Sequence, residues 1–328
     1  MTICGFILIA FSAFACQLPS KSKVTEDVVY AQGLTHSDWR ADDGKPMDLV
    51  LDVYEPLEPS PTKMPVIVLI HGGGFTGGTH KKPEFIEMAD FFVENGFVVF
   101  SIDYRVAGDN GTLPSNYPDL MVDDVTEKEI NQWYALYPAC RDAKAAIRWI
   151  RAQAEVYNLD TDRITAIGGS AGSILSVALG VSNEEDCVTE VTEQEDPTLA
   201  GTHLDQSSSV DTVIDHWGGP MIVRMLETIN PRDRFDATDA PVSIVHGTED
   251  PTVLFDQALE LKAEYESTGV DFAWYPLEGA GHGPWPTSAR GSSVGRGTNV
   301  LAANTRFRPF CERCRRRWSQ GKNRGWST

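Results

Sequence analysis

The strongest chemical signal of the sequence is the motif Gly168-Gly169-Ser170-Ala171-Gly172, which has the form G-x-S-x-G. A serine in such a motif sits on a sharp turn between a strand and a helix, which exposes its hydroxyl and leaves room only for small neighbours. An apolar run over 164–168 leads into the motif, and a helical pattern begins near Ser173. Taken alone, the pattern also fits an ordinary connection between a strand and a helix.

A second motif, His71-Gly72-Gly73-Gly74-Phe75, follows the apolar run 66–70. Consecutive glycines let the backbone approach a ligand closely and turn its N–H groups toward a developing negative charge. We expect Gly73 and Gly74 to donate in this way, together with the N–H of Ala171. The alternatives are a turn without a ligand and a phosphate cradle, but the sequence has no G-x-x-x-x-G-K-[ST] motif.

A serine hydroxyl needs a base that takes its proton, and the base needs a carboxylate that orients it. Asp250 follows the apolar run 242–246, and His282 follows the run 272–275. Each therefore stands just past the carboxyl end of an expected strand, as Ser170 does, and open parallel sheets place their ligands at that edge. The chain order Ser, Asp, His predicts a catalytic triad.

Other acidic and histidine residues compete for these roles. Glu249 is the alternative to Asp250 as the orienting acid. Asp215 also ends an expected strand, but the segment that it opens is interpreted as pocket wall. His71 and His246 are interpreted as structural residues that are hydrogen-bonded at strand ends.

The elements that must hold these residues alternate along the chain. Expected strands cover 49–54, 66–70, 98–102, 164–168, 210–215, 242–246 and 272–275, and expected helices cover 83–94, 142–157 and 255–268. Such alternation implies an α/β fold with a mostly parallel central sheet and helices on both faces. Two stretches interrupt it: 107–137 is interpreted as an insertion at the pocket rim, and 182–209 as an acidic, solvated loop insertion.

The two glycine motifs and the ordered triad resemble the α/β-hydrolase family. They are most similar to carboxylesterases with an HGGGF oxyanion motif, in the hormone-sensitive-lipase-like and the feruloyl or acetyl esterase groups. The resemblance extends from about Tyr30 to Trp285 and includes SIDYR at 101–105. It implies an α/β-hydrolase fold and a serine carboxylesterase that needs no metal or organic cofactor.

The resemblance also implies the site residues and the substrate class. The implied roles are Ser170 as nucleophile, His282 as general base, Asp250 as orienting acid, and Gly73, Gly74 and Ala171 as oxyanion donors. The expected partner is a small ester with a short acyl chain, in a pocket for which Phe75, Trp217 and Trp285 are candidate wall residues. Two alternatives stay open, namely a serine peptidase of the prolyl-oligopeptidase type and a non-catalytic binding member of the fold.

Composition and charge limit the partners. The chain has 328 residues, of which 41% are apolar, and a formal net charge of −19. Residues 289–328 hold ten Lys or Arg and one Glu, so the negative excess lies entirely in the preceding residues. An acidic body repels nucleic acid and anionic membranes, and we expect no nucleic-acid partner for the catalytic domain. The sequence carries no signal of the oligomeric state.

The N-terminus predicts export. The apolar run 3–16 is shorter than the roughly 20 residues of a membrane-spanning helix, and Ala13-Phe14-Ala15 has the small-x-small form of a cleavage site. We interpret 1–16 as a signal peptide, with lipid anchoring at Cys16 as the alternative. The protein would then be secreted, periplasmic or a membrane-anchored lipoprotein.

The remaining boundaries follow from these assignments. We interpret 17–29 as a polar tether, 30–288 as the α/β-hydrolase catalytic domain, and 289–328 as a basic tail that is disordered or non-native. Cys140 and Cys187 could form a disulfide in an oxidising compartment, which the sequence leaves open.

Overall fold

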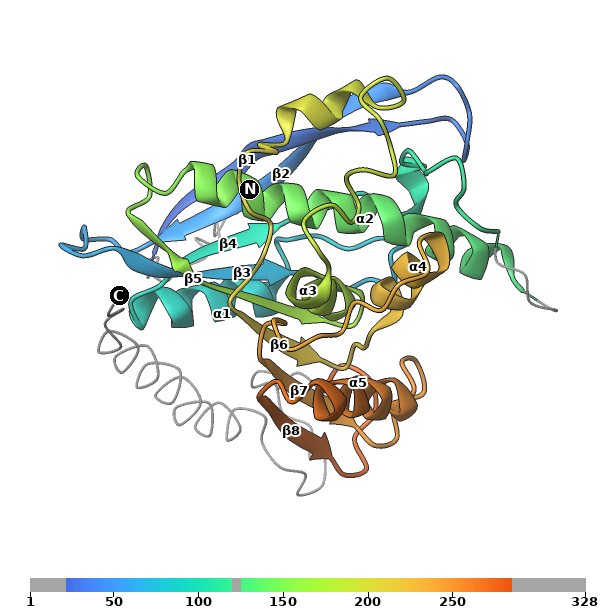
Figure 1. Cartoon of the computed structure of the whole chain (residues 1–328). Coiled ribbons are helices and arrows are strands. Elements are labelled where there is room, and N and C mark those ends of the chain that lie inside the picture. The colour runs from blue at the N-terminus through green and yellow to red at the C-terminus, as the bar shows by residue number, and fades with distance from the viewer. Residues whose placement is uncertain (1–21, 120–124, 285–328) are drawn as a thin grey trace, which may run out of the picture.

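The structure is a computed structural model that describes residues 22–119 and 125–284 (Figure 1). Its strands are β1 (Lys23–Thr35), β2 (Lys45–Glu55), β3 (Met64–Ile70), β4 (Val98–Ile102), β5 (Leu159–Gly169), β6 (Thr212–His216), β7 (Val242–Gly247) and β8 (Phe272–Leu277). Its helices are α1 (Pro83–Glu94), α2 (Glu127–Ala152), α3 (Ala171–Val181), α4 (Met221–Ile229) and α5 (Phe255–Thr268), with short 3-10 turns η1 (Ala107–Asp109) and η2 (Pro197–Gly201).

One eight-stranded sheet in the order β1-β2-β4-β3-β5-β6-β7-β8 organises the described residues. β2 runs antiparallel to β1 and to β4. The six strands β4, β3, β5, β6, β7 and β8 run parallel to one another. The mostly parallel sheet predicted from the sequence is confirmed. Each central strand is a nearly continuous apolar run because helices bury both of its faces.

The two faces of the sheet form two hydrophobic cores. In β3, Val66, Val68 and Ile70 point into the larger core, to which α2, α3, α4 and α5 contribute, and Ile67 and Leu69 point into the smaller core with α1 (Figure 1). This alternation is the two-residue period of a strand. None of the helices within the described ranges is long and apolar enough to cross a membrane.

Helix α2 begins much earlier than the sequence predicted, at Glu127 instead of 142, so the last third of the expected rim insertion 107–137 is helical. The side chain of Thr126 accepts the N–H of Glu129, and the carboxylate of Glu129 accepts the N–H of Thr126. This reciprocal capping box marks the start of the helix. Pro138 lies inside α2, and an internal proline hides a helix from pattern reading because it removes a backbone donor.

The expected tether 17–29 is wrong from Lys23 onward, because Lys23–Thr35 is strand β1. β1 is the edge strand of the sheet, and its first five residues are exposed. An edge strand with an exposed first half lacks the apolar run by which buried strands are found. The predicted signal peptide 1–16, the tail 289–328 and Trp285 lie outside the described residues, so export stays a prediction.

The segment 182–209 is exposed over about half of its residues, but it is not solvated throughout, because buried residues anchor it to the domain. The carboxylates of Asp186 and Asp196 are fully buried, where Asp186 pairs with Arg234 at 3.0 Å and Asp196 pairs with Arg141 at 2.5 Å. A buried carboxylate requires such a partner. Cys187 of this segment is a buried free thiol, as is Cys140.

A buried ion pair ties β4, α2 and β1 together. Nη2 of Arg105 lies 2.6 Å from Oδ1 of Asp142, Nε lies 2.9 Å from Oδ2, and Nη1 donates to the carbonyl of Leu34 at 2.9 Å. The side chains of Arg105 and Asp142 are only 1% and 2% exposed. Removal of one partner would leave the other charge buried without compensation.

We therefore expect Asp142→Asn to lower the free energy of unfolding by about 3–5 kcal/mol. Urea denaturation followed by circular dichroism measures this loss. The control is Glu155→Gln, which breaks the exposed pair between Lys63 and Glu155 and should leave the unfolding midpoint within experimental error. Equal effects of the two substitutions would contradict the prediction.

Candidate active site

Ser170 occupies the turn between β5 and α3 with φ 58° and ψ −124°. A positive φ is strained for a residue with a side chain, and such strain is typical of functional positions. The turn also needs glycine on both sides. A Cβ on Gly168 would lie 2.1 Å from the carbonyl carbon of Gly172, and a Cβ on Gly172 would lie 1.9 Å from the carbonyl oxygen of Ile70. The motif thus holds the hydroxyl at the carboxyl edge of the sheet.

The structure brings Ser170, His282 and Asp250 together. Nε2 of His282 lies 3.0 Å from Oγ of Ser170, and Nδ1 lies 2.7 Å from Oδ2 of Asp250. The other carboxylate oxygen of Asp250 accepts the N–H groups of Thr252, at 2.8 Å, and Val253, at 3.0 Å. Asp250 is 4% exposed, so the backbone fixes its carboxylate with one oxygen directed at the imidazole.

Three strand ends position these side chains. Ser170 directly follows β5, Asp250 comes three residues after β7, and His282 comes five residues after β8. Because parallel strands end at the same edge, residues that are 112 positions apart in the chain meet there. Nε2 of His246, at the end of β7, donates to the carbonyl of Val253 at 2.8 Å. This agrees with its predicted structural role and supports the loop that carries Asp250.

The arrangement can move a proton. Oγ of Ser170 can donate its proton to Nε2 of His282 while the carboxylate of Asp250 holds the proton on Nδ1 and offsets the charge of the imidazolium. A hydroxyl activated in this way attacks acyl carbon atoms.

The competing acids are placed elsewhere. Glu249 is exposed, and the imidazole of His282 has Asp250 as its carboxylate partner. Asp215 is fully buried below the turn, where it accepts the hydroxyl of Ser173 and the N–H of Gly218. Burial raises the pKa of Asp215 to about 6. Asp215 thus supports the first turn of α3.

The loop 71–78 lies over Ser170 and is held through its carbonyl groups. The carbonyl of Gly73 accepts the N–H and the hydroxyl of Thr76, both at 3.1 Å, and the carbonyl of Gly74 accepts Nε2 of Gln132 at 2.7 Å. Among the described residues, no hydrogen bond takes up the N–H of Gly73 or Gly74. The N–H of Ala171, at the first position of α3, has no intrahelical acceptor. These three donors remain available to a ligand.

Three glycines of this loop have backbone conformations that favour glycine, with φ 150° at Gly73, 60° at Gly74 and 133° at Gly78. A Cβ on Gly72 would lie 2.5 Å from the carbonyl oxygen of Gly169 and 3.2 Å from Cβ of Ser170. The loop therefore approaches Ser170 more closely than any residue with a side chain would permit.

The glycines at 72, 74 and 77 also fit G-x-G-x-x-G by letter. That motif binds a dinucleotide where it opens a helix, so that the pyrophosphate meets the helix N-terminus. Here an irregular loop follows the glycines, and helix α1 begins only at Pro83. The structure thus argues against the phosphate cradle.

Comparison with known proteins identifies the family. Residues 51–123 and 131–230, more than half of the chain, match the model of the BD-FAE family. The chain belongs to the BD-FAE family. The matched region contains the glycine loop, the turn at Ser170 and all of α4, whereas Asp250 and His282 lie beyond it.

Two curated relatives of this BD-FAE chain are named esterases, and each is much longer than the segment that matches. Fumonisin B1 esterase of Sphingopyxis macrogoltabida is 30% identical over 125 residues, which cover 38% of this chain and 21% of that protein. Esterase LipC of Mycobacterium tuberculosis is 23% identical over 263 residues, which cover 71% of this chain and 56% of that protein. The chain therefore spans less than two thirds of either relative.

Solved structures show the same fold. Esterase Est2 of Thermogutta terrifontis with bound propionate has a TM-score of 0.57 and 24% identity, and the match covers 88% of this chain and 91% of that chain. The predicted α/β-hydrolase fold is confirmed by this likeness and by the sheet topology.

An open hollow of about 560 Å³ adjoins the glycine loop of this BD-FAE domain, and its lining includes Trp39, Thr76, Asn110 and Asn131. Thr76 lines the hollow and also donates its hydroxyl to the carbonyl of Gly73, so it connects the hollow to the loop.

The predicted wall residues Phe75 and Trp217 are both buried. The ring of Phe75 lies 6.2 Å from that of Tyr104, and the ring of Trp217 stacks on His216 at 5.2 Å. Packing in the interior therefore accounts for both positions, and their contact with a substrate stays a prediction.

Sequence reasoning missed the side chains that hold the loop. Gln132 lies in the part of α2 that the sequence analysis assigned to an insertion, and Lys82 donates to the carbonyl of Gly72 from the residue before α1. No motif marks a side chain that binds a backbone carbonyl. The capping box at Thr126 was the one signal that could have placed Gln132 on a helix.

The contact between His282 and Asp250 predicts how fast Ser170 reacts. We expect Asp250→Asn to slow the modification of Ser170 by a fluorophosphonate by about 10³–10⁴-fold, because the amide favours the wrong imidazole tautomer. Mass spectrometry of the intact protein over time measures the rate. Glu249→Gln is the matched control and should leave the rate unchanged; a slower reaction of the Glu249 variant instead would assign the acid to that residue.

Proposed function

We propose that this protein is a serine carboxylesterase that hydrolyses small carboxylic esters with short acyl chains. The observation that carries the proposal is the chain of contacts from Oγ of Ser170 through His282 to Asp250, at 3.0 and 2.7 Å, beside N–H groups that have no acceptor within residues 22–119 and 125–284. Membership of the BD-FAE family and the esterase names of the relatives support the same reaction.

The proposed reaction begins when Oγ of Ser170 attacks the ester carbonyl and His282 takes the hydroxyl proton. The carbonyl oxygen becomes an oxyanion, which the N–H groups of Gly73, Gly74 and Ala171 stabilise. Each such donor contributes about 10²–10³ in rate. The intermediate collapses as the imidazolium of His282 protonates the departing alcohol, which leaves an acyl group on Ser170.

The second half of the reaction repeats the first with water as the nucleophile. His282 removes a proton from water, the hydroxide attacks the acyl carbonyl, and the same N–H groups stabilise the second oxyanion. Ser170 then leaves with the proton that His282 returns, and the carboxylic acid is released. The side chain of His282 is 23% exposed, so water can reach it. No step in this scheme draws on a metal or an organic cofactor.

The preference for short acyl chains is inferred from a solved structure of the same fold and from a sequence motif. Est2, which shares the fold, was solved with propionate bound, and we extend this acyl size to the present chain. The resemblance of residues 71–75 to the HGGGF motif of carboxylesterases supports the same choice.

Replacement of the proposed nucleophile tests the function. We expect Ser170→Ala to lower kcat on p-nitrophenyl butyrate by about 10³–10⁶-fold, since the remaining groups cannot form the acyl-enzyme. Steady-state kinetics measure the loss, and circular dichroism verifies the fold. Ser267→Ala, on the exposed side of α5, should keep full activity. Wild-type turnover by the Ser170 variant, or no turnover of any ester by the native chain, would refute the proposal, the latter in favour of a binding protein.

The substrate class is tested by a graded series. We expect kcat/KM to be highest for acetate, propionate and butyrate esters and to fall by at least about tenfold for dodecanoate, because most side chains that line the hollow beside the glycine loop are polar and give added methylenes little to bury against. Peptide amides of matched acyl groups should be turned over much more slowly. Faster cleavage of the amides would favour a peptidase.

A further inference from the structure

The carbonyl oxygen of Gly72 receives two side-chain contacts beside the nucleophile turn. Nζ of Lys82 donates to it at 2.9 Å, and Nδ1 of His71 lies 3.1 Å from it. Lys82 stands immediately before α1, so its ammonium reaches back from the helix start to the glycine loop. Both contacts come from nitrogen groups that can carry positive charge.

The same peptide bond joins the Gly72 carbonyl to the N–H of Gly73, one of the proposed oxyanion donors. Every described peptide bond is trans, and in a trans peptide the C=O and N–H groups point in opposite directions. Contacts that fix the carbonyl of Gly72 therefore fix the direction of the Gly73 N–H. The close approach of Gly72 to Gly169 and to Cβ of Ser170 places this peptide beside the turn that carries the hydroxyl.

The charge of the donor matters as well as its position. A hydrogen bond from an ammonium to a carbonyl is charge-assisted and stronger than a neutral one. It draws electron density toward the carbonyl oxygen, which makes the N–H of the same amide a better donor, since hydrogen bonds in a chain polarise one another. Lys82 thus acts on the far side of the peptide from the oxyanion.

We propose that Lys82 is a positioning residue of the oxyanion hole. Its ammonium aligns and polarises the peptide between Gly72 and Gly73, and thereby strengthens the N–H that receives the negative charge of the tetrahedral intermediate. The inference rests on the proposed esterase function and adds a residue that touches neither the substrate nor Ser170.

A network of contacts between imidazoles and carboxylates anchors the ring of His71 on the side away from Gly72. Its Nε2 lies 2.8 Å from Oδ1 of Asp103, Oδ2 of Asp103 lies 3.0 Å from Nδ1 of His80, and Nε2 of His80 lies 3.1 Å from Oδ1 of Asp52. Burial alone would raise the pKa of Asp103, but the two imidazoles outweigh it and hold that pKa well below its usual range. His71 is therefore an anchored partner of the Gly72 carbonyl, and Lys82 is the one that can be replaced without disrupting the network.

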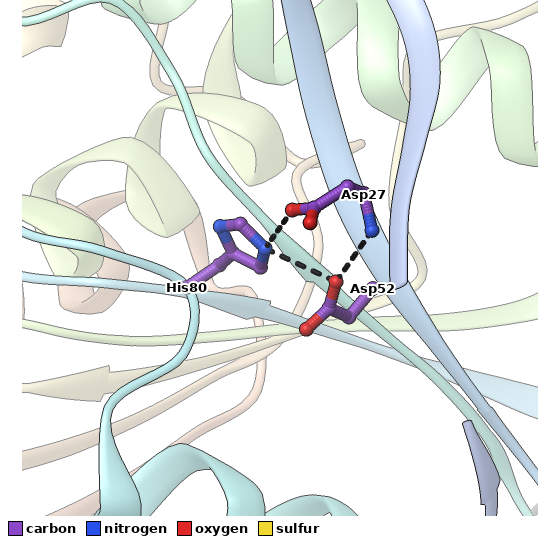
Figure 2. Close-up of side chains that lie close together, drawn as sticks. All are labelled: Asp27, Asp52 and His80. Carbon is purple, nitrogen blue, oxygen red and sulfur yellow. Dashed lines mark hydrogen bonds and ion pairs between the residues drawn. The ribbon is translucent and has the colours of Figure 1, made fainter. Parts of the chain in front are cut away.

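Figure 2 shows the outer end of this network, where His80 faces Asp52 and Asp27. These three residues offer ligand atoms of the kind that bind metal ions. However, Nζ of Lys81 lies 2.8 Å from Oδ2 of Asp27, and both ring nitrogens of His80 already face carboxylates. The ligand atoms of the cluster thus already have partners within the protein, so we assign the cluster to the support of His71.

The test compares two lysines, one on the Gly72 carbonyl and one remote from it. We expect Lys82→Met to lower kcat on p-nitrophenyl butyrate by about tenfold, less than the loss of a whole oxyanion donor, with KM nearly unchanged because the ground-state ester gains little from the N–H. Lys63→Met removes an exposed ammonium that pairs with Glu155 and should keep kcat. Lys82→Arg, which retains the positive charge, should recover most of the activity.

A tetrahedral inhibitor separates positioning from a structural role. A trifluoromethyl ketone adds to Ser170 and places an oxyanion where the intermediate would have it, so its inhibition constant in Lys82→Met should rise by the factor by which kcat falls. Unchanged kcat in Lys82→Met, or a lower kcat without a matching rise in that constant, would overturn the inference. An inactive wild type would instead refute the proposed function, so the two failures are distinguishable.

Discussion

The contact between Oγ of Ser170 and Nε2 of His282 is the constraint on which the rest of the site depends. It closes over a gap of 112 residues, and local sequence cannot maintain it. What maintains it is the register of β5, β6, β7 and β8, which are parallel and end at one edge. The apolar runs that bury the carboxyl ends of β5, β6 and β7 on both faces, together with the half-buried edge strand β8, therefore also determine the separation of the hydroxyl and the imidazole.

The glycine loop poses the opposite problem, because it has no regular hydrogen-bond ladder of its own. Glycines lose more conformational entropy on folding than other residues, and an unrestrained loop would not hold its N–H groups in place. Three carbonyls of the loop are instead bound by Lys82, Thr76 and Gln132. Each bond to a carbonyl restricts one peptide and leaves an N–H free. Side chains in α2 and before α1 thus preorganise the loop.

The sequence predicted the centre of this molecule well for a physical reason. Strands buried on both faces must be apolar, so β4 was predicted with its observed bounds, and the turn residues around Ser170 must be glycine or alanine because the backbones nearly touch. Asp250 and His282 were found because each follows an apolar run, and because they follow Ser170 in the order that the triad requires. These signals come from steric exclusion and burial, which act residue by residue and are visible in a single sequence.

The sequence failed where pairing between distant segments decides the outcome. β1 is polar over its exposed first half, yet it pairs along β2. Asp186 and Asp196 read as solvated acids, because nothing near them in the chain shows that Arg234 and Arg141 reach them. The start of α2 was missed for a local reason, since its first residues were assigned to the insertion 107–137 although Thr126 and Glu129 form a capping box there.

The segments that the sequence could not place also form the hollow beside the glycine loop. Its lining comes from the connection between β1 and β2, from the stretch around η1, and from the first turn of α2. None of these belongs to the parallel strands that set the distance from Ser170 to His282. Substitutions there can reshape the space for the substrate while the triad and the sheet edge keep their geometry, because loops carried on a rigid scaffold vary independently of it. The proposed ester hydrolysis therefore rests on a few fixed residues, whereas we expect the choice of ester to depend on these surrounding segments.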